Sequence, residues 1–155
     1  MSDSNEAQSL PTRKHISVAV IGSGFAGLSA AMEAANSGAG RVVIFEKMNK
    51  AGGNSIMNAG QIAAVGSPSQ EKAGIKDSVQ LMKKDMLAAG INLNHPNLLE
   101  KMIRESYETV KWTQSEFGIK YRDRVTQMGG HSVPRTLSTE NHCGEKIVTF
   151  ILFCQ

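Results

Sequence analysis

The segment 17–46 constrains the fold of this chain more than any other part of the sequence. An apolar strand at residues 18–21 leads directly into the loop 22–27, which reads Gly-Ser-Gly-Phe-Ala-Gly. A helix of small residues follows, and a second apolar strand at 42–45 ends on Glu46. Strand, glycine loop, helix, strand and acid in this order predict a βαβ unit with parallel strands, the kind of unit that binds an adenine dinucleotide.

Each glycine of the loop has a physical role at its position. Gly22 permits the tight turn, Gly24 lets the backbone approach a pyrophosphate, and Gly27 lets the helix pack closely against the strand. The start of the helix offers free N–H groups and a partial positive charge to phosphates. Glu46 lies about twenty residues past the loop, where a carboxylate accepts hydrogen bonds from ribose hydroxyls. A glycine-rich helix start that binds nothing is the alternative, and the surrounding elements argue against it.

The composition indicates one globular domain and excludes several other classes. The chain has 155 residues, 41% hydrophobic and 20% charged, so we do not expect a disordered protein. Its net charge of +3 comes from basic residues scattered among acids, which argues against nucleic-acid binding. No apolar run reaches membrane-spanning length, and we expect no membrane span. The polar leader does not resemble a secretory signal, so we predict a cytoplasmic location, with a mitochondrial one as the alternative.

Cysteine and histidine residues are few and do not form a recognised ligand pattern. Cys143 and Cys154 are too few for a disulfide framework and predict reduced thiols. His131, His142 and Cys143 do not have the spacing of a metal site, so no metal is expected.

The order of segments predicts three parts of the chain. Residues 1–14 are expected to form a flexible leader, 15–148 the N-terminal portion of the domain, and 149–155 an atypical apolar tail. The small, polar residues of 47–69 predict an extended loop with short helical turns. A loop this long inside a domain usually has a function.

Two amphipathic helices are predicted further along the chain. We expect Asp77 to cap the first, which runs to about Ala89. Asn97 is expected to cap a longer second helix that runs to about Phe117, with a supporting pair between Glu100 and Arg104.

A second glycine motif after Glu46 distinguishes between nicotinamide and flavin cofactors. Gly52-Gly53 admits the backbone close to a pyrophosphate, and Asn54 and Ser55 offer hydrogen bonds to phosphate and ribityl oxygens. Ala59-Gly60 follows, and Gly60 leaves room for a flat ring against the chain. An NAD-dependent dehydrogenase domain has no need of this element, and a degenerate interaction domain has no need of intact glycines. The motif therefore predicts FAD.

These motifs together resemble the flavoprotein subunits of fumarate reductases and succinate dehydrogenases, and within that family the soluble, flavocytochrome-c-type and yeast-like fumarate reductases. The blocks that carry the resemblance lie at 20–28, 46–47, 52–55, 112–117 and 129–136. The resemblance covers about residues 17–148. It implies an α/β fold, a Rossmann-like FAD-binding domain around a parallel sheet that is incomplete at the C-terminus of this chain.

The resemblance also implies a set of contacts with the cofactor. Together with the glycine motifs it gives this list of cofactor-binding residues: Gly22, Gly24, Ala26, Gly27, Glu46, Lys47, Gly52, Gly53, Asn54, Ser55, Ala59 and Gly60. In the family, the position of Gly60 also touches a bound dicarboxylate. No His occurs in residues 56–65, where the membrane-bound branch attaches FAD, so non-covalent binding is expected.

The sequence departs from the family in the groups that act on a substrate. In the family an Arg delivers a proton to fumarate, and further side chains hold its carboxylates, all from regions beyond residue 155. Arg135 belongs to a different block, and we expect it to be structural; Leu137 stands where the soluble branch has a basic residue or His. We therefore expect an FAD-binding portion of a fumarate-reducing oxidoreductase with no catalytic residue of its own. The alternative is a truncated, non-catalytic FAD-binding fragment; the electron donor is not implied by any motif.

Overall fold

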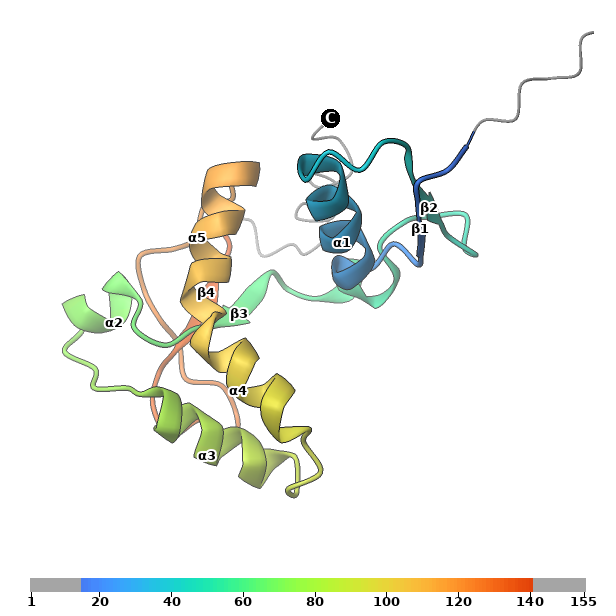
Figure 1. Cartoon of the computed structure of the whole chain (residues 1–155). Coiled ribbons are helices and arrows are strands. Elements are labelled where there is room, and N and C mark those ends of the chain that lie inside the picture. Colours follow the sequence, from blue (N-terminus) through green and yellow to red (C-terminus); the bar gives the residue numbers. More distant parts are fainter. Residues whose placement is uncertain (1–14, 141–155) are drawn as a thin grey trace, which may run out of the picture.

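The computed structural model describes residues 15–140 of the chain and shows two groups of elements (Figure 1). Helix α1 and strands β1 and β2 form one group, and the remaining helices and strands form the other. The leader 1–14, His142, Cys143 and the tail 149–155 lie outside the described residues. Within residues 15–140, no helix is long and apolar enough to cross a membrane.

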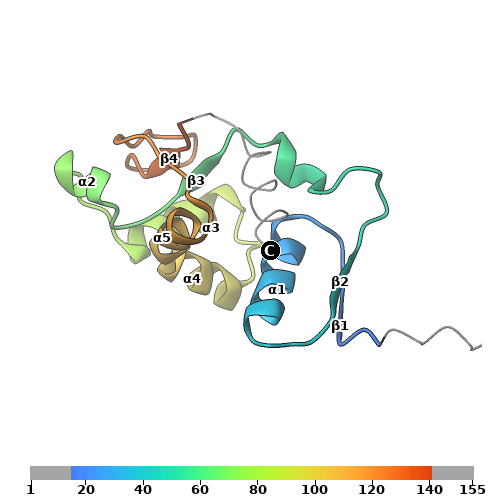
Figure 2. The same ribbon diagram turned by 90° about the horizontal axis from the view of Figure 1, so that it is seen from above.

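The first group is the predicted βαβ unit. Strand β1 spans Val18–Ile21, helix α1 spans Phe25–Asn36 and strand β2 spans Val42–Phe45. The two strands pair in parallel, with Val18 opposite Val42. Helix α1 lies along one side of this pair, as the view from above shows (Figure 2). The parallel sheet expected from the sequence is confirmed.

The segment after β2 contains more regular structure than the predicted loop. A 3₁₀ helix, η1, spans Gly53–Met57, strand β3 spans Gln61–Ala63 and helix α2 spans Pro68–Lys72. Ser67 caps α2 in a capping box. Strand β3 pairs in antiparallel register with β4, Thr136–Ser138.

The first amphipathic helix is present, but its predicted cap is wrong. Helix α3 spans Val79–Ala89, and the side chain of Ser78 accepts a hydrogen bond from the N–H of Leu81 at 3.0 Å. Asp77 instead binds the guanidinium group of Arg135, with two oxygen–nitrogen distances of 2.9 Å. The acid that sequence reasoning used as a cap thus belongs to a long-range ion pair.

The second amphipathic helix is divided in two. Helix α4 spans Pro96–Arg104 and helix α5 spans Ser106–Phe117, with Glu105 between them. His95 caps α4, so the predicted cap at Asn97 is also wrong. The predicted pair is confirmed, since Arg104 donates two hydrogen bonds to Glu100 at 2.7 and 3.0 Å.

Three apolar clusters form the core, and the first of them joins the two groups of elements. Leu28 of α1 packs with Phe117 and Ile119, which places α1 against the end of α5. Leu137 packs with Ala64 and Val110 and is buried. Residue 137 is therefore a core position. Met82, Leu99 and Ile103 fill the space between α3 and α4.

A buried charge network fixes the second group. The side chain of Arg135 is fully buried and binds Asp77 and Asp85, the latter at 2.6 Å. Ser132 donates its N–H to Asp85 at 2.8 Å and its hydroxyl to the same carboxylate. Arg135 has a structural role, as the sequence predicts, because its guanidinium N–H groups bind two buried carboxylates.

Candidate functional site: a glycine-lined cleft at the end of β1 and β2

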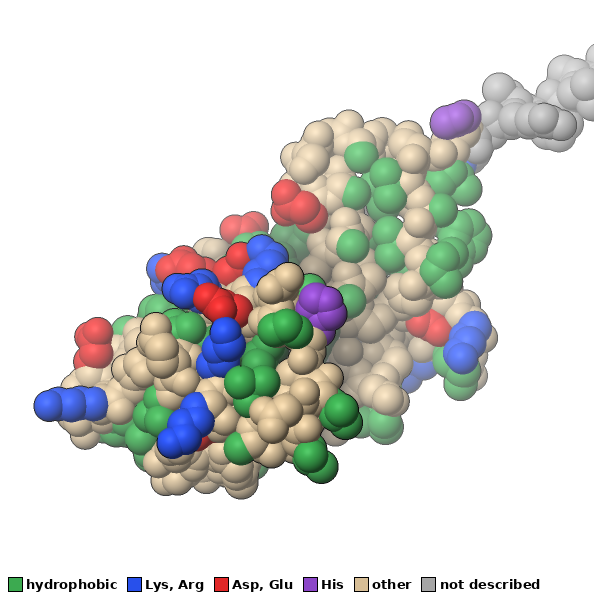
Figure 3. Space-filling model, turned by 60° about the horizontal axis from the view of Figure 1, so that its bottom comes forward, with side chains coloured by type: hydrophobic (Ala, Val, Ile, Leu, Met, Phe, Trp, Pro, Cys, Tyr) green, Lys and Arg blue, Asp and Glu red, His purple; other side chains and the backbone are tan. Residues whose placement is uncertain are grey.

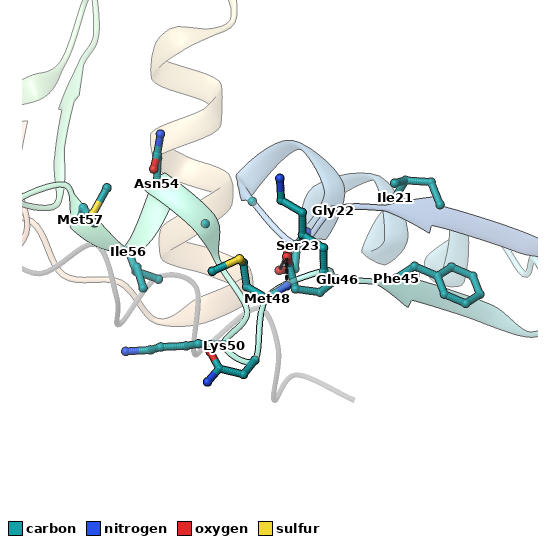
Figure 4. Close-up of a pocket in the computed structure, with 14 residues that line it drawn as sticks. Ile21, Gly22, Ser23, Phe45, Glu46, Met48, Lys50, Asn54, Ile56 and Met57 are labelled. Atoms are coloured by element: carbon teal, nitrogen blue, oxygen red, sulfur yellow. Dashed lines mark hydrogen bonds between the residues drawn. The ribbon is translucent and has the colours of Figure 1, made fainter.

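A cleft of about 730 Å³ lies where β1 and β2 end (Figure 4). Its walls come from the glycine loop, the turn after β2 and the start of η1. This is the carboxyl edge of the parallel pair, where open α/β sheets bind their ligands. Six of the predicted cofactor residues line it: Gly22, Gly24, Glu46, Lys47, Gly53 and Asn54.

The glycine loop has the conformation that its sequence predicts. Gly22 has a φ of +93°, which favours glycine. A Cβ on Gly27 would lie 2.0 Å from the carbonyl oxygen of Gly22, so only glycine fits where α1 crosses the loop. Gly24 precedes α1 and has no side chain with which to cap the helix.

Glu46 is held by three hydrogen bonds at the edge of the cleft. Its Oε2 accepts the N–H of Ser23 at 3.0 Å and also the hydroxyl of Ser23. Its Oε1 accepts the N–H of Met48 at 2.9 Å. The Ser23 hydroxyl, followed by the Met48 and Ser23 amides, lowers the pKa of Glu46 to about 2. The side chain is therefore an anion at neutral pH and acts as a hydrogen-bond acceptor.

The second glycine motif is tied to the first by two serines. Gly52 has a φ of +109°, and its N–H donates to Ser23 Oγ at 2.9 Å. Ser55 Oγ accepts the first N–H of α1, from Phe25, at 3.0 Å. Because that oxygen accepts, the Ser55 hydroxyl proton remains available to a ligand.

Four predicted residues lie away from the cleft. Ala26 is exposed and Gly27 is partly buried in the first turn of α1, and Ala59 and Gly60 precede β3. Gly60 is buried, has a φ of +66° and donates its N–H to Asn58 Oδ1 at 2.6 Å. It lines a second cavity, of about 270 Å³, with Phe25, Trp112 and Tyr121 among its walls.

Sequence reasoning missed Ser23 and the apolar rim of the cleft. Ser23 is only 1% exposed and contacts both Glu46 and Gly52. The sequence feature that could have indicated its role is a hydroxyl residue between two glycines of the loop. Ile21 and Phe45 line the cleft although both are largely exposed. The sequence indicates this role only weakly, because an apolar residue at a strand end predicts a core position as readily as a ligand contact.

Charges elsewhere on the surface are mixed. Figure 3 shows acidic and basic side chains next to one another on one face of the molecule. Surface ion pairs such as Lys83–Glu100, at 2.7 Å, join side chains of opposite charge. Among residues 15–140, no group of three His, Cys, Asp or Glu side chains is placed to hold a metal ion.

The cleft fits an adenine dinucleotide. Its volume lies in the range of small-molecule sites, its backbone cradle is made of glycines, and an anionic acceptor stands at the strand end. The βαβ unit and this cleft together define a dinucleotide-binding domain of the Rossmann type.

The particular family follows from comparison with known proteins. The family model described as "FAD binding domain" matches residues 17–150, and the chain belongs to this family. The cofactor is accordingly FAD, as the second glycine motif predicts.

Three relatives show how the chain compares with longer proteins. It is 43% identical over 149 residues to the acrylate reductase flavoprotein subunit of Shewanella woodyi, covering 96% of this chain and 29% of that protein. It is 39% identical to the fumarate reductase (cytochrome) of Shewanella frigidimarina, covering 77% of this chain and 20% of that one. The structure of an open flavocytochrome c3 fumarate reductase superposes with a TM-score of 0.80 at 30% identity, over 88% of this chain and 24% of that chain. The chain thus spans less than a third of each of these three proteins.

Proposed function

We propose that this chain is the FAD-binding portion of a flavin-dependent oxidoreductase that reduces fumarate to succinate. The observation that carries the proposal is the joining of two glycine motifs around one anionic acceptor, Glu46. Relatives named fumarate reductase and acrylate reductase share this part of the chain. When bound, FAD supplies hydride chemistry toward the double bond of an unsaturated acid.

The cleft suggests a role for each group of predicted residues. Glu46 accepts a ribose hydroxyl of the adenosine half through the oxygen that Ser23 does not occupy. Gly24 and the start of α1 receive the pyrophosphate, with Asn54 and the Ser55 hydroxyl as further donors. Lys47 adds a positive charge at the rim.

Gly60 is proposed to lie at the flavin and substrate end of the site. It borders the second cavity, whose aromatic walls include Trp112 and Tyr121. Residues 56–65 contain no His, which supports non-covalent binding of FAD. A small dicarboxylate is the substrate we propose for the complete protein, and the cytoplasm its location.

A second candidate function is FAD binding without catalysis by this chain. No Arg or His lines the cleft in the part of the chain that the structure describes. Arg135 is the one arginine of residues 129–136, and its guanidinium group is bound by Asp77 and Asp85. Within residues 15–140, the second cavity beside Gly60 likewise has no Arg in its lining that could deliver a proton to fumarate.

An absorption spectrum with a matched pair of variants tests the proposal. The purified chain is expected to show flavin bands at about one FAD per chain. Glu46→Gln should weaken FAD binding about tenfold, because it loses a charge-assisted hydrogen bond. Glu33→Gln, on the exposed side of α1, is the control and should bind as the wild type does.

Fumarate reduction driven by reduced viologen separates the two candidates. We expect no turnover by the isolated chain, and measurable turnover would overturn the claim that its cleft lacks the acting groups. A folded chain that binds no FAD would contradict both candidates.

A further inference from the structure

Ser23 lines the cleft, yet its N–H and its hydroxyl are both taken up by other parts of the site. Its side chain is 1% exposed. Its N–H donates to Glu46 Oε2 at 3.0 Å, and its hydroxyl donates to the same oxygen. The hydroxyl also accepts the N–H of Gly52 at 2.9 Å. Every polar group of this residue except its carbonyl is thus directed at another part of the site.

We propose that Ser23 is a positioning residue of the FAD site, whose hydroxyl holds Glu46 and the turn at Gly52 in one fixed arrangement. Glu46 lies 23 residues and Gly52 lies 29 residues further along the chain. A single hydroxyl joins them because it donates one hydrogen bond and accepts another at the same time. This proposal rests on the proposed function, since it concerns the same FAD site.

The geometry of Glu46 explains why this bridge matters for the ligand. Both bonds from Ser23 fall on Oε2, and the Met48 N–H falls on Oε1. The two bonds from Ser23 therefore occupy Oε2 and leave acceptor capacity on Oε1, the oxygen proposed above to accept a ribose hydroxyl of the cofactor. Without the hydroxyl, the carboxylate and the Gly52 turn each gain freedom that binding must then remove.

FAD titrations of the full 155-residue chain test the bridge, with flavin fluorescence as the readout. We expect Ser23→Ala to weaken FAD binding about tenfold, since it removes a hydrogen bond to a charged group. Ser23→Thr retains the hydroxyl and should restore most of the affinity. The effects of S23A and E46Q should be strongly non-additive in the double variant, because both disturb the same contact.

Ser106→Ala is the matched control for a lost buried hydroxyl. Ser106 is also buried, accepts the Val65 N–H at 3.2 Å and donates to the Ile103 carbonyl at 2.7 Å, outside the cleft. S106A should lower the thermal midpoint as S23A does while leaving FAD affinity unchanged.

Three outcomes decide between the proposals. If S23A binds FAD as tightly as the wild type, Ser23 does not position Glu46. The same follows if the losses of FAD affinity caused by S23A and by E46Q multiply in the double variant, as expected for independent sites. If S106A weakens FAD binding as much as S23A, the effect is one of general stability. If the wild-type chain itself binds no FAD, the proposed function fails and this inference fails with it.

Discussion

Replacing Gly27 with Ala tests most directly whether the glycine loop is built as the structure indicates. The new Cβ would lie 2.0 Å from the carbonyl oxygen of Gly22 and 3.0 Å from its carbonyl carbon. It would also lie 3.4 Å from the Val20 side chain. The atoms in closest conflict belong to backbone, which has no rotamer with which to move aside. Either α1 or the loop must therefore shift, by a distance on the order of 1 Å.

The expected loss of stability combines two opposing effects. Alanine is a better helix former than glycine by about 1 kcal/mol, which favours the variant. Overpacking of a well-fitted contact costs about 1–3 kcal/mol and sometimes more. With backbone as the obstacle the upper end applies, so the free energy of unfolding should fall by about 2 kcal/mol net. Because the shift falls in the loop that faces the cofactor, FAD affinity should fall as well.

Urea unfolding followed by circular dichroism measures the first effect, and an FAD titration measures the second. Gly129→Ala is the control, because no atom lies within 4 Å of its added Cβ and its φ is not positive. That variant should stay within about 0.5 kcal/mol of the wild type. A G27A chain with the unfolding midpoint and FAD affinity of G129A would refute the close crossing of α1 over the loop.

Two further predictions concern the buried charge network. Arg135→Leu should lower the free energy of unfolding in urea by about 3–5 kcal/mol, because it leaves two buried carboxylates without their guanidinium partner. The control Arg104→Ala breaks an exposed pair and should cost under about 1 kcal/mol. Equal losses in the two variants would contradict the buried network. The Ser132 hydroxyl, the Ser132 amide and Arg135 lower the pKa of Asp85 to about 2. A pKa lowered in the folded state gives stability that is present above the unfolded value and lost as the pH falls through the folded one. The free energy of unfolding should therefore decline between about pH 4 and pH 2, and Asp85→Asn should make that decline shallower.

The parts of the fold that sequence predicts are those set by neighbouring residues. The βαβ unit closes within residues 17–46, and its turn, crossing and strand pairing follow from Gly22, Gly27 and two apolar runs. Strand β3 was missed because its partner lies far along the chain, with Gln61 opposite Ser138. Three residues of β3 carry too short a pattern to predict a strand without that partner.

The error in the predicted cap of α3 has a physical cause. Asp77 and Ser78 are both good caps in sequence, and the choice depends on a guanidinium group that arrives from residue 135. Asp77 binds Arg135, and Ser78 is left to cap α3. Local propensity cannot decide between two suitable neighbours when a buried charge from elsewhere requires one of them.

The same reasoning explains why the predicted cofactor residues divide between two cavities. Six predicted residues between Gly22 and Asn54 gather around one cleft, because Ser23 and Ser55 tie the two glycine motifs together. Ala59 and Gly60 come after η1, at the start of β3, and Thr139 beside β4 donates its N–H to the Gly60 carbonyl at 2.9 Å. Gly60 is thus positioned by the long-range β3–β4 pairing, and the cleft by contacts within residues 22–55. An extended cofactor that reaches both cavities would therefore draw its adenosine contacts from local folding and its ring contacts from the assembled sheet.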